Sequence, residues 1–405
     1  MSGFDLPAQS AAPVSPGKLG AGLIALLALL TALEALAIDL YLPGMPSMAV
    51  DLASSPARIQ QTLAVFLIGL AIGQGLYGPL LDRFGRRVPL LIGVVVFVAG
   101  SLLAAVAPNV EVLLLARFIQ ALGASAGLVA PRAIVADRCT LQESATVFAL
   151  LMQVMMIGPI VAPLIGGWLL QHGGWRLTFW VLAAASTAAF LWALVGVPET
   201  LPVAQRKPLA WASLRAAYGG LLRRRAFMVY TVAGGLVLGA FFAYIGGSAF
   251  VFTSHYGLSA TQFSYVFAAN SLGLVAGGFV STALIGRGAA TERVLALGLG
   301  GFSIAAAVLL LATWLVGVPL LVYGGLLCLA IASLGLVFGN LTALTMHQAG
   351  ADAGAASALM GTLQYLVAAL VGMAVSAVPT GPGQVPLAMA VCGAVTWLAC
   401  ARLRR

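Results

Sequence analysis

Long apolar segments recur along the whole chain, and they limit its possible folds more than any other feature. A helix needs roughly 20 apolar residues to cross the hydrocarbon of a bilayer, and many segments here reach that length. Of the 405 residues, 61% are hydrophobic and only 8% are charged. Soluble domains carry about 25% charged residues, so a water-soluble core does not explain this composition. The sequence therefore predicts an all-α integral membrane protein.

Proline, glycine and charged residues divide the apolar sequence into about twelve segments of membrane-spanning length. These segments are expected near residues 19–42, 60–80, 88–107, 111–136, 144–169, 176–197, 226–249, 262–285, 292–314, 318–344, 354–378 and 384–401. The links between them are short and leave no room for a separate soluble domain.

One internal boundary divides the segments into two groups of six. Residues 198–225 combine Glu199 and several prolines with six of the 20 lysine and arginine residues, which is typical of a polar linker. The expected organisation is a tail at 1–18, a first bundle at 19–197, a linker at 198–225, a second bundle at 226–401 and a tail at 402–405.

Basic residues gather at alternate ends of the expected spans. Apart from Arg117 within a span, only Arg58 and Arg176 fall at the opposite ends. Lysine and arginine are enriched in the cytoplasmic loops of membrane proteins. Both termini are therefore expected in the cytoplasm. The net charge of +9 follows from this topology, so the lipid bilayer is an expected partner and nucleic acid is not.

The turn at residues 78–87, GPLLDRFGRR, concentrates charge between two apolar segments. Its charged members are Asp82, Arg83, Arg86 and Arg87. Gly78 and Gly85 would permit close approach of another backbone. The carboxylate of Asp82 is placed to accept hydrogen bonds from the free N–H groups at the start of another helix. The alternative is a solvated cluster that only marks topology.

Three ionisable residues, Glu34, Asp39 and Arg117, lie inside expected spans. A charge there costs on the order of 3 kcal/mol, so such residues normally face a partner or a cavity. At 1.5 Å per residue, Asp39 lies about 6 Å and Arg117 about 9 Å below the same membrane surface. This similar depth predicts a direct or water-bridged pair of Asp39 and Arg117 between the first and fourth spans.

Movement of Arg117 relative to Asp39 would act as a proton switch. A nearby guanidinium favours the charged carboxylate, whereas burial without it favours the protonated acid. Glu34 lies about 140° from Asp39 around an ideal helix, so both line one cavity only if it exposes a wide arc. The alternatives are a structural ion pair for Asp39 and Arg117 and a packing carboxyl group for Glu34.

Several motifs resemble the major facilitator superfamily. Residues 78–87 are similar to its signature loop, G-x-L-x-D-R-x-G-R-R/K, and residues 113–123 to its helix 4 motif, whose arginine is implicated in proton transfer. Residues 38–46 resemble the aspartate-containing segment of bicyclomycin- and chloramphenicol-resistance-type exporters. The antiporter motif G-P-x-x-G-G is resembled by Gly158, Pro159, Pro163, Gly166 and Gly167, with Ala162 where that motif usually has glycine.

The resemblance implies a major facilitator fold, in which two pseudo-symmetric six-helix bundles face each other across a central site. It also implies that Asp82 meets the start of the eleventh helix, near Ala353, and that Arg86 bridges to Asp137. Such contacts would latch the cytoplasmic side and favour the outward-facing state. The antiporter motif implies export rather than uptake.

Polar and amphipathic side chains within the spans are the candidates for a substrate cavity. They are Tyr41, Gln120, Gln153, Tyr244, Asn270, Asn340, Gln364 and Tyr365. Each is alternatively a residue that forms a hydrogen bond between helices. The four cysteines show no CxxC spacing, and no GxxxxGK(S/T) loop is present. No metal, cofactor or ATP site is therefore expected.

These features predict a secondary transporter of the bacterial inner membrane, acting as a monomer and not as an enzyme. It is expected to export small amphiphilic antibiotics in exchange for protons by alternating access. The alternative on the same fold is a proton-coupled exporter or importer of sugars or other metabolites. An intramembrane enzyme would need a catalytic set inside the spans, yet His172, His255 and His347 lie at expected span ends. A structural or receptor protein would leave the intramembrane charges unexplained.

Overall fold

The computed structural model describes residues 19–206, 218–349 and 353–403, and all regular structure within them is helical. The long helices are α1 (Ala21–Asp39), α3 (Pro56–Phe84), α4 (Arg87–Ala105), α5 (Val110–Arg138), α6 (Leu141–Gly196), α8 (Arg225–Phe250), α9 (Ala260–Gly286), α10 (Thr291–Leu315), α11 (Leu320–His347), α12 (Ala353–Ser376) and α13 (Gln384–Leu403). The short elements are η1 (Leu42–Gly44), α2 (Met45–Asp51), η2 (Val203–Gln205) and the π-helical η3 (Val251–His255). The expected tail at 1–18, part of the expected linker and the end of the expected C-terminal tail lie outside the described residues.

The longest helix, α6, contains two of the expected spans. Its backbone leaves the helical region at Gly173 and Gly174, where Gly174 has φ 69° and ψ −176°. This conformation is accessible essentially to glycine alone. Before the break, Gly166 packs against Leu40 near the end of α1, and after it Gly196 packs against Leu26 near the start of α1. The two arms of α6 therefore run along α1 in opposite directions.

The expected number of spans is confirmed. Eleven described helices are long and apolar enough to cross a membrane, and α6 is one of them. Because α6 consists of two antiparallel arms, the described residues form twelve segments of membrane-spanning length in an all-α fold.

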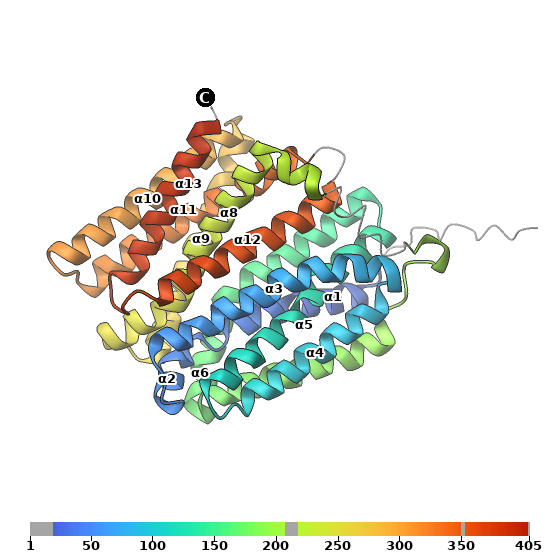
Figure 1. Ribbon diagram of the computed structural model, residues 1–405, viewed down its shortest axis with the longest axis horizontal. Helices are drawn as coiled ribbons and strands as arrows, with labels where there is room; N and C mark the ends of the chain where they lie inside the picture. The colour runs from blue at the N-terminus through green and yellow to red at the C-terminus, as the bar shows by residue number, and fades with distance from the viewer. Residues whose placement is uncertain (1–18, 207–217, 350–352, 404–405) are drawn as a thin grey trace, which may run out of the picture.

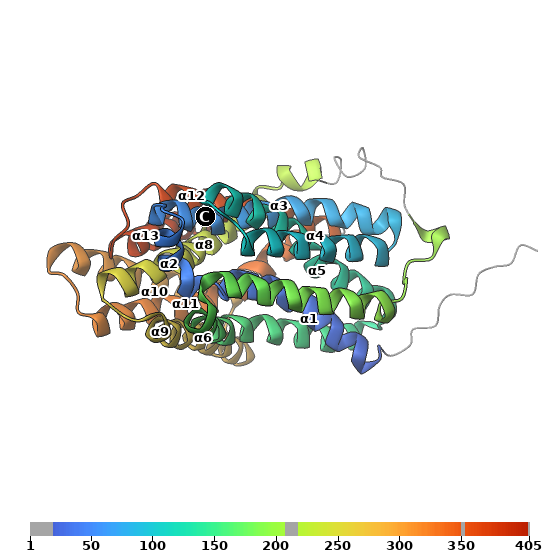
Figure 2. The same cartoon turned by 90° about the horizontal axis from the view of Figure 1, so that it is seen from below.

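The helices form two bundles, which Figure 1 shows as a blue-to-green group and a yellow-green-to-red group. In the first bundle, α5 packs against α3 and α4, and α1 packs against α6. In the second bundle, α8 packs against α12 and α13, and α11 packs against α9 and α10. The bundles meet along two seams, α3 with α12 and α6 with α9. In the view of Figure 2, these seams lie on opposite sides of the molecule.

Polar caps extend several helices beyond the expected spans. Ser55 accepts a hydrogen bond from the N–H of Arg58, so α3 begins at Pro56 rather than near residue 60. Proline at the first helical position is favourable because its missing N–H needs no partner there. At its other end, α3 continues through Pro79 to Phe84. Most of the sequence expected as a turn at 78–87 is therefore helical, and the turn itself is confined to residues 85–86.

The two ends of the bundles differ in charge, and we name them by that difference. The basic end carries the connections at residues 85–86, 139–140, 197–206, 218–224 and 287–290. The opposite end carries the connections at residues 40–55, 106–109, 173–174, 251–259, 316–319 and 377–383.

Candidate functional site

Arg117 lies on α5 inside an aromatic cage and is fully buried. Its guanidinium carbon is 4.5 Å from the ring centroid of Tyr41 and 4.2 Å from that of Phe66. The ring of Phe179, on the second arm of α6, lies 5.8 Å away. A desolvated cation over an aromatic face gains up to about 2 kcal/mol. The cage therefore offsets part of the cost of burying the charge.

A hydrogen-bond chain leads from Arg117 toward α4. Its Nη1 donates to Oε1 of Gln120, whose Nε2 donates to Oγ of Ser101 at 2.8 Å. Nε and Nη2 of Arg117 are buried without a hydrogen-bond partner. The expected direct pair with Asp39 is absent in this conformation, because the guanidinium is directed into the cage and toward Gln120.

Asp39 is the last residue of α1 and is only 2% exposed. Pro43 has no N–H with which to continue the helix by bonding the Asp39 carbonyl, so α1 ends here. The Oδ1 atom of Asp39 is buried without a hydrogen-bond partner. Buried polar atoms almost always have partners. Asp39 and Arg117 therefore both retain unused hydrogen-bonding capacity in this state.

Glu34 connects the two bundles. It lies on α1 and is 3% exposed. The Oη atom of Tyr365, on α12, donates to Oε1 of Glu34 at 3.4 Å. The structure thus brings Glu34, expected to couple protons, into contact with Tyr365, expected to line a cavity. The two residues belong to different bundles.

The residues of the antiporter motif lie on the first arm of α6, between α1 and α9. A Cβ atom on Gly166 would lie 1.9 Å from the carbonyl oxygen of Leu40, so only glycine permits this contact with α1. Gly158 faces Ala35 of the same helix. The segment is therefore packed directly against the helix that carries Glu34 and Asp39.

The prolines of this motif expose backbone acceptors to the second bundle. Pro163 has no N–H, so it leaves the carbonyl of Pro159 without its helical partner. Oγ of Ser271, on α9, donates to that carbonyl at 3.2 Å. Oγ of Ser264 donates to the Pro163 carbonyl at 2.8 Å, next to Gly167. The motif thus forms part of the α6–α9 seam.

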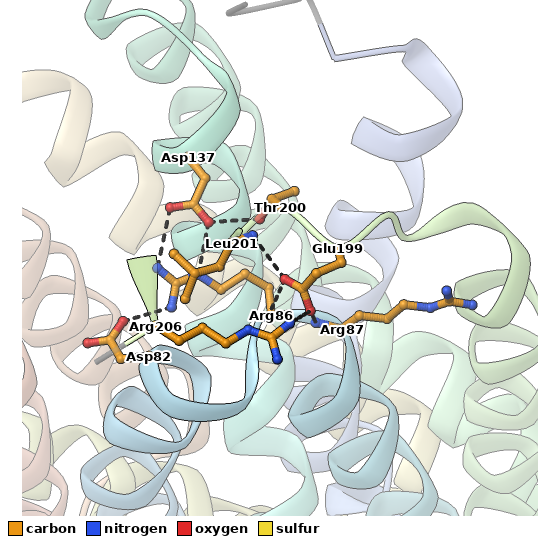
Figure 3. A network of polar contacts seen from close by, with 8 residues as sticks. All are labelled: Asp82, Arg86, Arg87, Asp137, Glu199, Thr200, Leu201 and Arg206. Atoms are coloured by element: carbon orange, nitrogen blue, oxygen red, sulfur yellow. Dashed lines mark hydrogen bonds and ion pairs between the residues drawn. The ribbon is translucent and has the colours of Figure 1, made fainter. Parts of the chain in front are cut away.

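At the basic end, Arg86 is the centre of the polar network in Figure 3. Its Nε donates to Oδ2 of Asp137 at 2.9 Å, and its Nη1 donates to Oδ1 of Asp82 at 2.7 Å. Thr200 also donates to Asp137, at 2.7 Å. The expected contact between Arg86 and Asp137 is present. Asp82 keeps 49% of its side chain exposed and bonds within its own bundle.

Glu199 is a carboxylate that lies at a helix start, that of α4. Glu199 accepts hydrogen bonds from the backbone N–H of Arg86 at 2.9 Å and of Arg87 at 3.4 Å, at the start of α4 (Figure 3). It also accepts from the N–H of Leu201, and Arg206 lies 3.7 Å away. Partial burial opposes its ionisation, but these donors and the nearby guanidinium outweigh burial and hold the pKa of Glu199 below its ordinary value.

The two glycines of the loop have different environments. Gly85 has φ 89°, and a Cβ atom there would lie 2.1 Å from Oε2 of Glu199. At Gly78 no heavy atom of the described residues lies within 4 Å of such a position, so the described residues do not show the expected close approach there. Arg83 is exposed, and Arg87 reaches the carbonyl of Leu194 at the end of α6.

The expected cavity residues do not all converge. Tyr244 stacks on Phe267 with centroids 5.3 Å apart, and its Oη accepts from Asn270 at 3.1 Å. Asn340 donates to Oγ of Ser281, between α11 and α9. Tyr41 is buried in the Arg117 cage, and Gln120 is buried beside it. Gln153 is exposed on α6, and Gln364 lies against Gly234. Gln120 and Asn340 therefore form hydrogen bonds between helices, which is the alternative that the sequence left open.

Sequence reasoning missed Phe66, Phe179 and Glu199. The two phenylalanines look like ordinary lipid-facing or core residues in an apolar span. Their role depends on tertiary packing between α3, α5 and α6. The position of Glu199 directly after the first six spans, next to Pro198, is the one local signal that a carboxylate stands near the basic loops.

Among the described residues, the hydrogen bonds between the bundles lie from the middle of the molecule to the opposite end. They join Gln60 with Gln384, Gln61 with Ser376, Gln171 with Thr261, Ser264 with Pro163, Ser271 with Pro159, and Tyr365 with Glu34. The contacts drawn in Figure 3 stay within the first bundle and the residues that follow it. The bundles are thus closed against each other at the opposite end.

Comparison with known proteins places these features in a family context. The sequence profile of the Major Facilitator Superfamily matches residues 27–373. An uncharacterized MFS-type transporter, YdgK of Bacillus subtilis, is 38% identical over 375 residues, covering 90% of this chain and 92% of the relative. A bicyclomycin resistance protein homolog of Haemophilus influenzae is 27% identical, covering 86% of this chain and 87% of its own. The xylose transporter XylE of E. coli, in a partially occluded inward open conformation, shares the fold, with a TM-score of 0.72 and 14% identity over 95% of this chain and 98% of its own.

Proposed function

The chain belongs to the major facilitator superfamily, and on that premise we propose that it exports small amphiphilic drugs in exchange for protons. It is a membrane transporter for small molecules and not an enzyme. The name of the bicyclomycin-resistance relative supports drugs as the substrate class. The position of the antiporter motif at the α6–α9 seam supports export.

We assign the basic end and both termini to the cytoplasm, because basic loops are retained on that side. The protein then resides in the bacterial inner membrane as a monomer. The bundles at 19–197 and 226–401 rock about the central seams, connected by the linker at 198–225 and flanked by the tails at 1–18 and 402–405. In this orientation the described conformation is closed on the outer side.

The single observation that carries the coupling proposal is the buried Asp39 whose Oδ1 has no partner. A buried carboxylate without donors is costly as an anion, so proton uptake permits the closed packing around the end of α1. Arg117 holds two unused donors in the same bundle. Its departure from the cage toward Asp39 in another state would favour release of the proton, and Glu34 is the second candidate for proton exchange.

The loop at the basic end serves as the conformational latch in this proposal. In the outward-facing state, Asp82 would exchange part of its contact with Arg86 for the N–H groups at the start of α12. Arg83 and Arg87 hold the loop at the membrane surface, while Arg86 and Asp137 keep it attached to α5. The latch thus closes the cytoplasmic side when the opposite end opens.

Substrate-induced proton release from proteoliposomes tests the proposal. The panel contains bicyclomycin, chloramphenicol and, as the alternative substrate class, sugars. Addition of the antibiotics is expected to cause proton release from the protein, whereas addition of the sugars is not. Asp39→Asn is expected to abolish proton release while leaving drug binding measurable. The matched control is Asp51→Asn, at an exposed carboxylate paired with Arg176, which is expected to retain activity. Full proton-coupled export by Asp39→Asn would refute the role of Asp39.

A further inference from the structure

Two glutamine side chains from different bundles bind each other at the end opposite the basic loops. Gln60 lies near the start of α3, and Gln384 is the first residue of α13. Nε2 of Gln60 donates to Oε1 of Gln384 at 3.2 Å, and Nε2 of Gln384 donates to Oε1 of Gln60 at 3.1 Å. The exposed fractions of these residues are 7% and 3%. The pair is therefore reciprocal and shielded from water.

The second bundle holds its half of this pair in place. Nε2 of Gln384 also contacts the carbonyl oxygens of Val375 at 2.9 Å and Val378 at 3.2 Å, where α12 ends. These contacts fix the amide of Gln384 in the orientation that meets Gln60. The pair thus depends on how the first bundle approaches a prearranged amide on the second.

Small residues allow the two bundles to approach closely beside the pair. A Cβ atom on Gly372 would lie 3.3 Å from Cβ of Ala64, which is one helical turn from Gln60. Gln60 also lines a small hollow together with Leu63, Phe242 and Val375. The amide pair therefore closes the α3–α12 seam above a hollow shared by both bundles, where Figure 1 shows the two helices side by side.

The chemistry of two amides suits a contact that must open and close. Each amide carries both donors and an acceptor, so two of them satisfy each other when the bundles meet. Water satisfies the same groups when the bundles part, and neither side chain is then left buried and unpaired. Both groups are uncharged, so external acid does not change the strength of the pair. A carboxylate in the same place would respond to the acidity that drives transport.

We propose that Gln60 and Gln384 form the latch of the outer gate, and that outward opening requires this amide pair to separate. The proposal rests on the alternating access and orientation of the proposed function. The strength of the Gln60–Gln384 pair sets the fraction of molecules that are closed on the outer side. Weakening the pair is expected to shift the population toward the outward-facing state.

The test measures access to the hollow beneath the pair. Cys139, Cys328, Cys392 and Cys400 are replaced, and Leu63→Cys provides one buried reporter thiol. A membrane-impermeant maleimide is added outside intact cells. Gln60→Ala and Gln384→Ala are each expected to raise the labelling rate at least about five-fold, the lower bound for losing two hydrogen bonds of ordinary net strength. The double variant is expected to label no faster than Gln384→Ala, because Gln384→Ala already removes the pair together with its contacts to Val375 and Val378.

The matched control is Gln61→Ala. Gln61 is adjacent to Gln60 and donates to Ser376 at 3.3 Å, but it is only partly buried. In the Gln61→Ala variant, the labelling rate of the reporter thiol is expected to change less than two-fold. Unchanged labelling in both pair variants, with normal expression and thermal stability, overturns the proposal. An equal increase in the Gln61 control overturns it as well, because the effect would then be a general loosening of the seam.

A second experiment covers variants that fold poorly. Gln60→Cys and Gln384→Cys are joined by a short, cleavable bifunctional thiol reagent. The cross-linked protein is expected to lose transport, and reductant is expected to restore it. Transport by the cross-linked protein would overturn the proposal that the Gln60–Gln384 pair must separate for outward opening. The labelling test measures neither drug export nor proton movement, so a failure of drug export with the expected labelling results removes only the proposed substrate.

Discussion

At the scale of single residues, Arg117 shows how a buried charge is accommodated without an acid. Rings from α3, α6 and the turn after α1 surround its guanidinium, while Gln120 accepts one of its hydrogen bonds. The sequence identifies the arginine because a charge inside an apolar span is conspicuous. It cannot identify Phe66 or Phe179 as neighbours, since these residues are distant along the chain and common in spans. Only the packed structure shows whether the Arg117 guanidinium pairs with Asp39 or lies in the aromatic cage.

Arg117→Lys is expected to reduce drug export more than ten-fold. Lysine keeps the charge, but its ammonium lacks the planar stacking surface and the forked donors of a guanidinium. Efflux from cells measures the effect, and the thermal midpoint in detergent shows that the variant folds. Arg58→Lys is the control, because Arg58 forms an exposed pair with Glu111. Exposed pairs contribute about 0–1 kcal/mol, so this variant should export normally.

At the scale of elements, the loop between α3 and α4 shows what a motif reveals and what it hides. Its glycines and charges were recognisable, but the boundary between helix and turn was not. The helix continues past Pro79 to Phe84 and stops only at Gly85, whose φ is 89°. The partner that completes the loop, Glu199, is more than one hundred residues away in sequence. A local pattern does not encode that long-range contact.

Gly85→Ala is expected to destabilise the protein, whereas Gly78→Ala is expected to be neutral. An alanine at the φ and ψ of Gly85 costs about 1–3 kcal/mol, and its Cβ would displace Glu199. A Cβ atom on Gly78 would meet no heavy atom of the described residues within 4 Å, and alanine favours the helix there. Thermal midpoints of the two purified variants provide the measurement. Equal midpoints would show that the described loop geometry is not maintained.

Replacing Glu199 with glutamine is expected to lower stability at neutral pH but not in acid. The pKa of Glu199 is lower in the folded protein than its ordinary value. The carboxylate therefore stabilises the fold above about pH 4.5, the range in which the unfolded chain is also ionised. That contribution disappears as the pH falls through the lowered folded pKa. Thermal midpoints of both proteins between pH 7 and pH 3 should therefore converge, and a constant difference would contradict this explanation.

At the scale of the whole molecule, apolar segment length was sufficient to predict an all-α membrane protein, whereas the arrangement in two facing bundles was implied by the resemblance of its motifs. Twelve segments separated by short links can satisfy their backbone groups in a bilayer only as helices. The conformational state could not be predicted in the same way, because both states of a rocking transporter use the same helices. The state depends on contacts such as Gln60 with Gln384, whose residues are separated by most of the chain.

The proposed orientation places the basic end in the cytoplasm, and two exposed valines allow a direct test. Val203 follows the first bundle at the basic end and is 76% exposed, while Val316 lies between α10 and α11 at the opposite end and is 83% exposed. In a cysteine-free background, Val316→Cys is expected to react with an impermeant maleimide on intact cells. Val203→Cys is expected to react only after permeabilisation. The positive-inside rule acts on the whole set of loops. Reversed labelling of these two cysteines would therefore show that the whole molecule has the opposite orientation in the membrane. It would also turn the described closed end toward the cytoplasm, and the Gln60–Gln384 latch would become an inner gate.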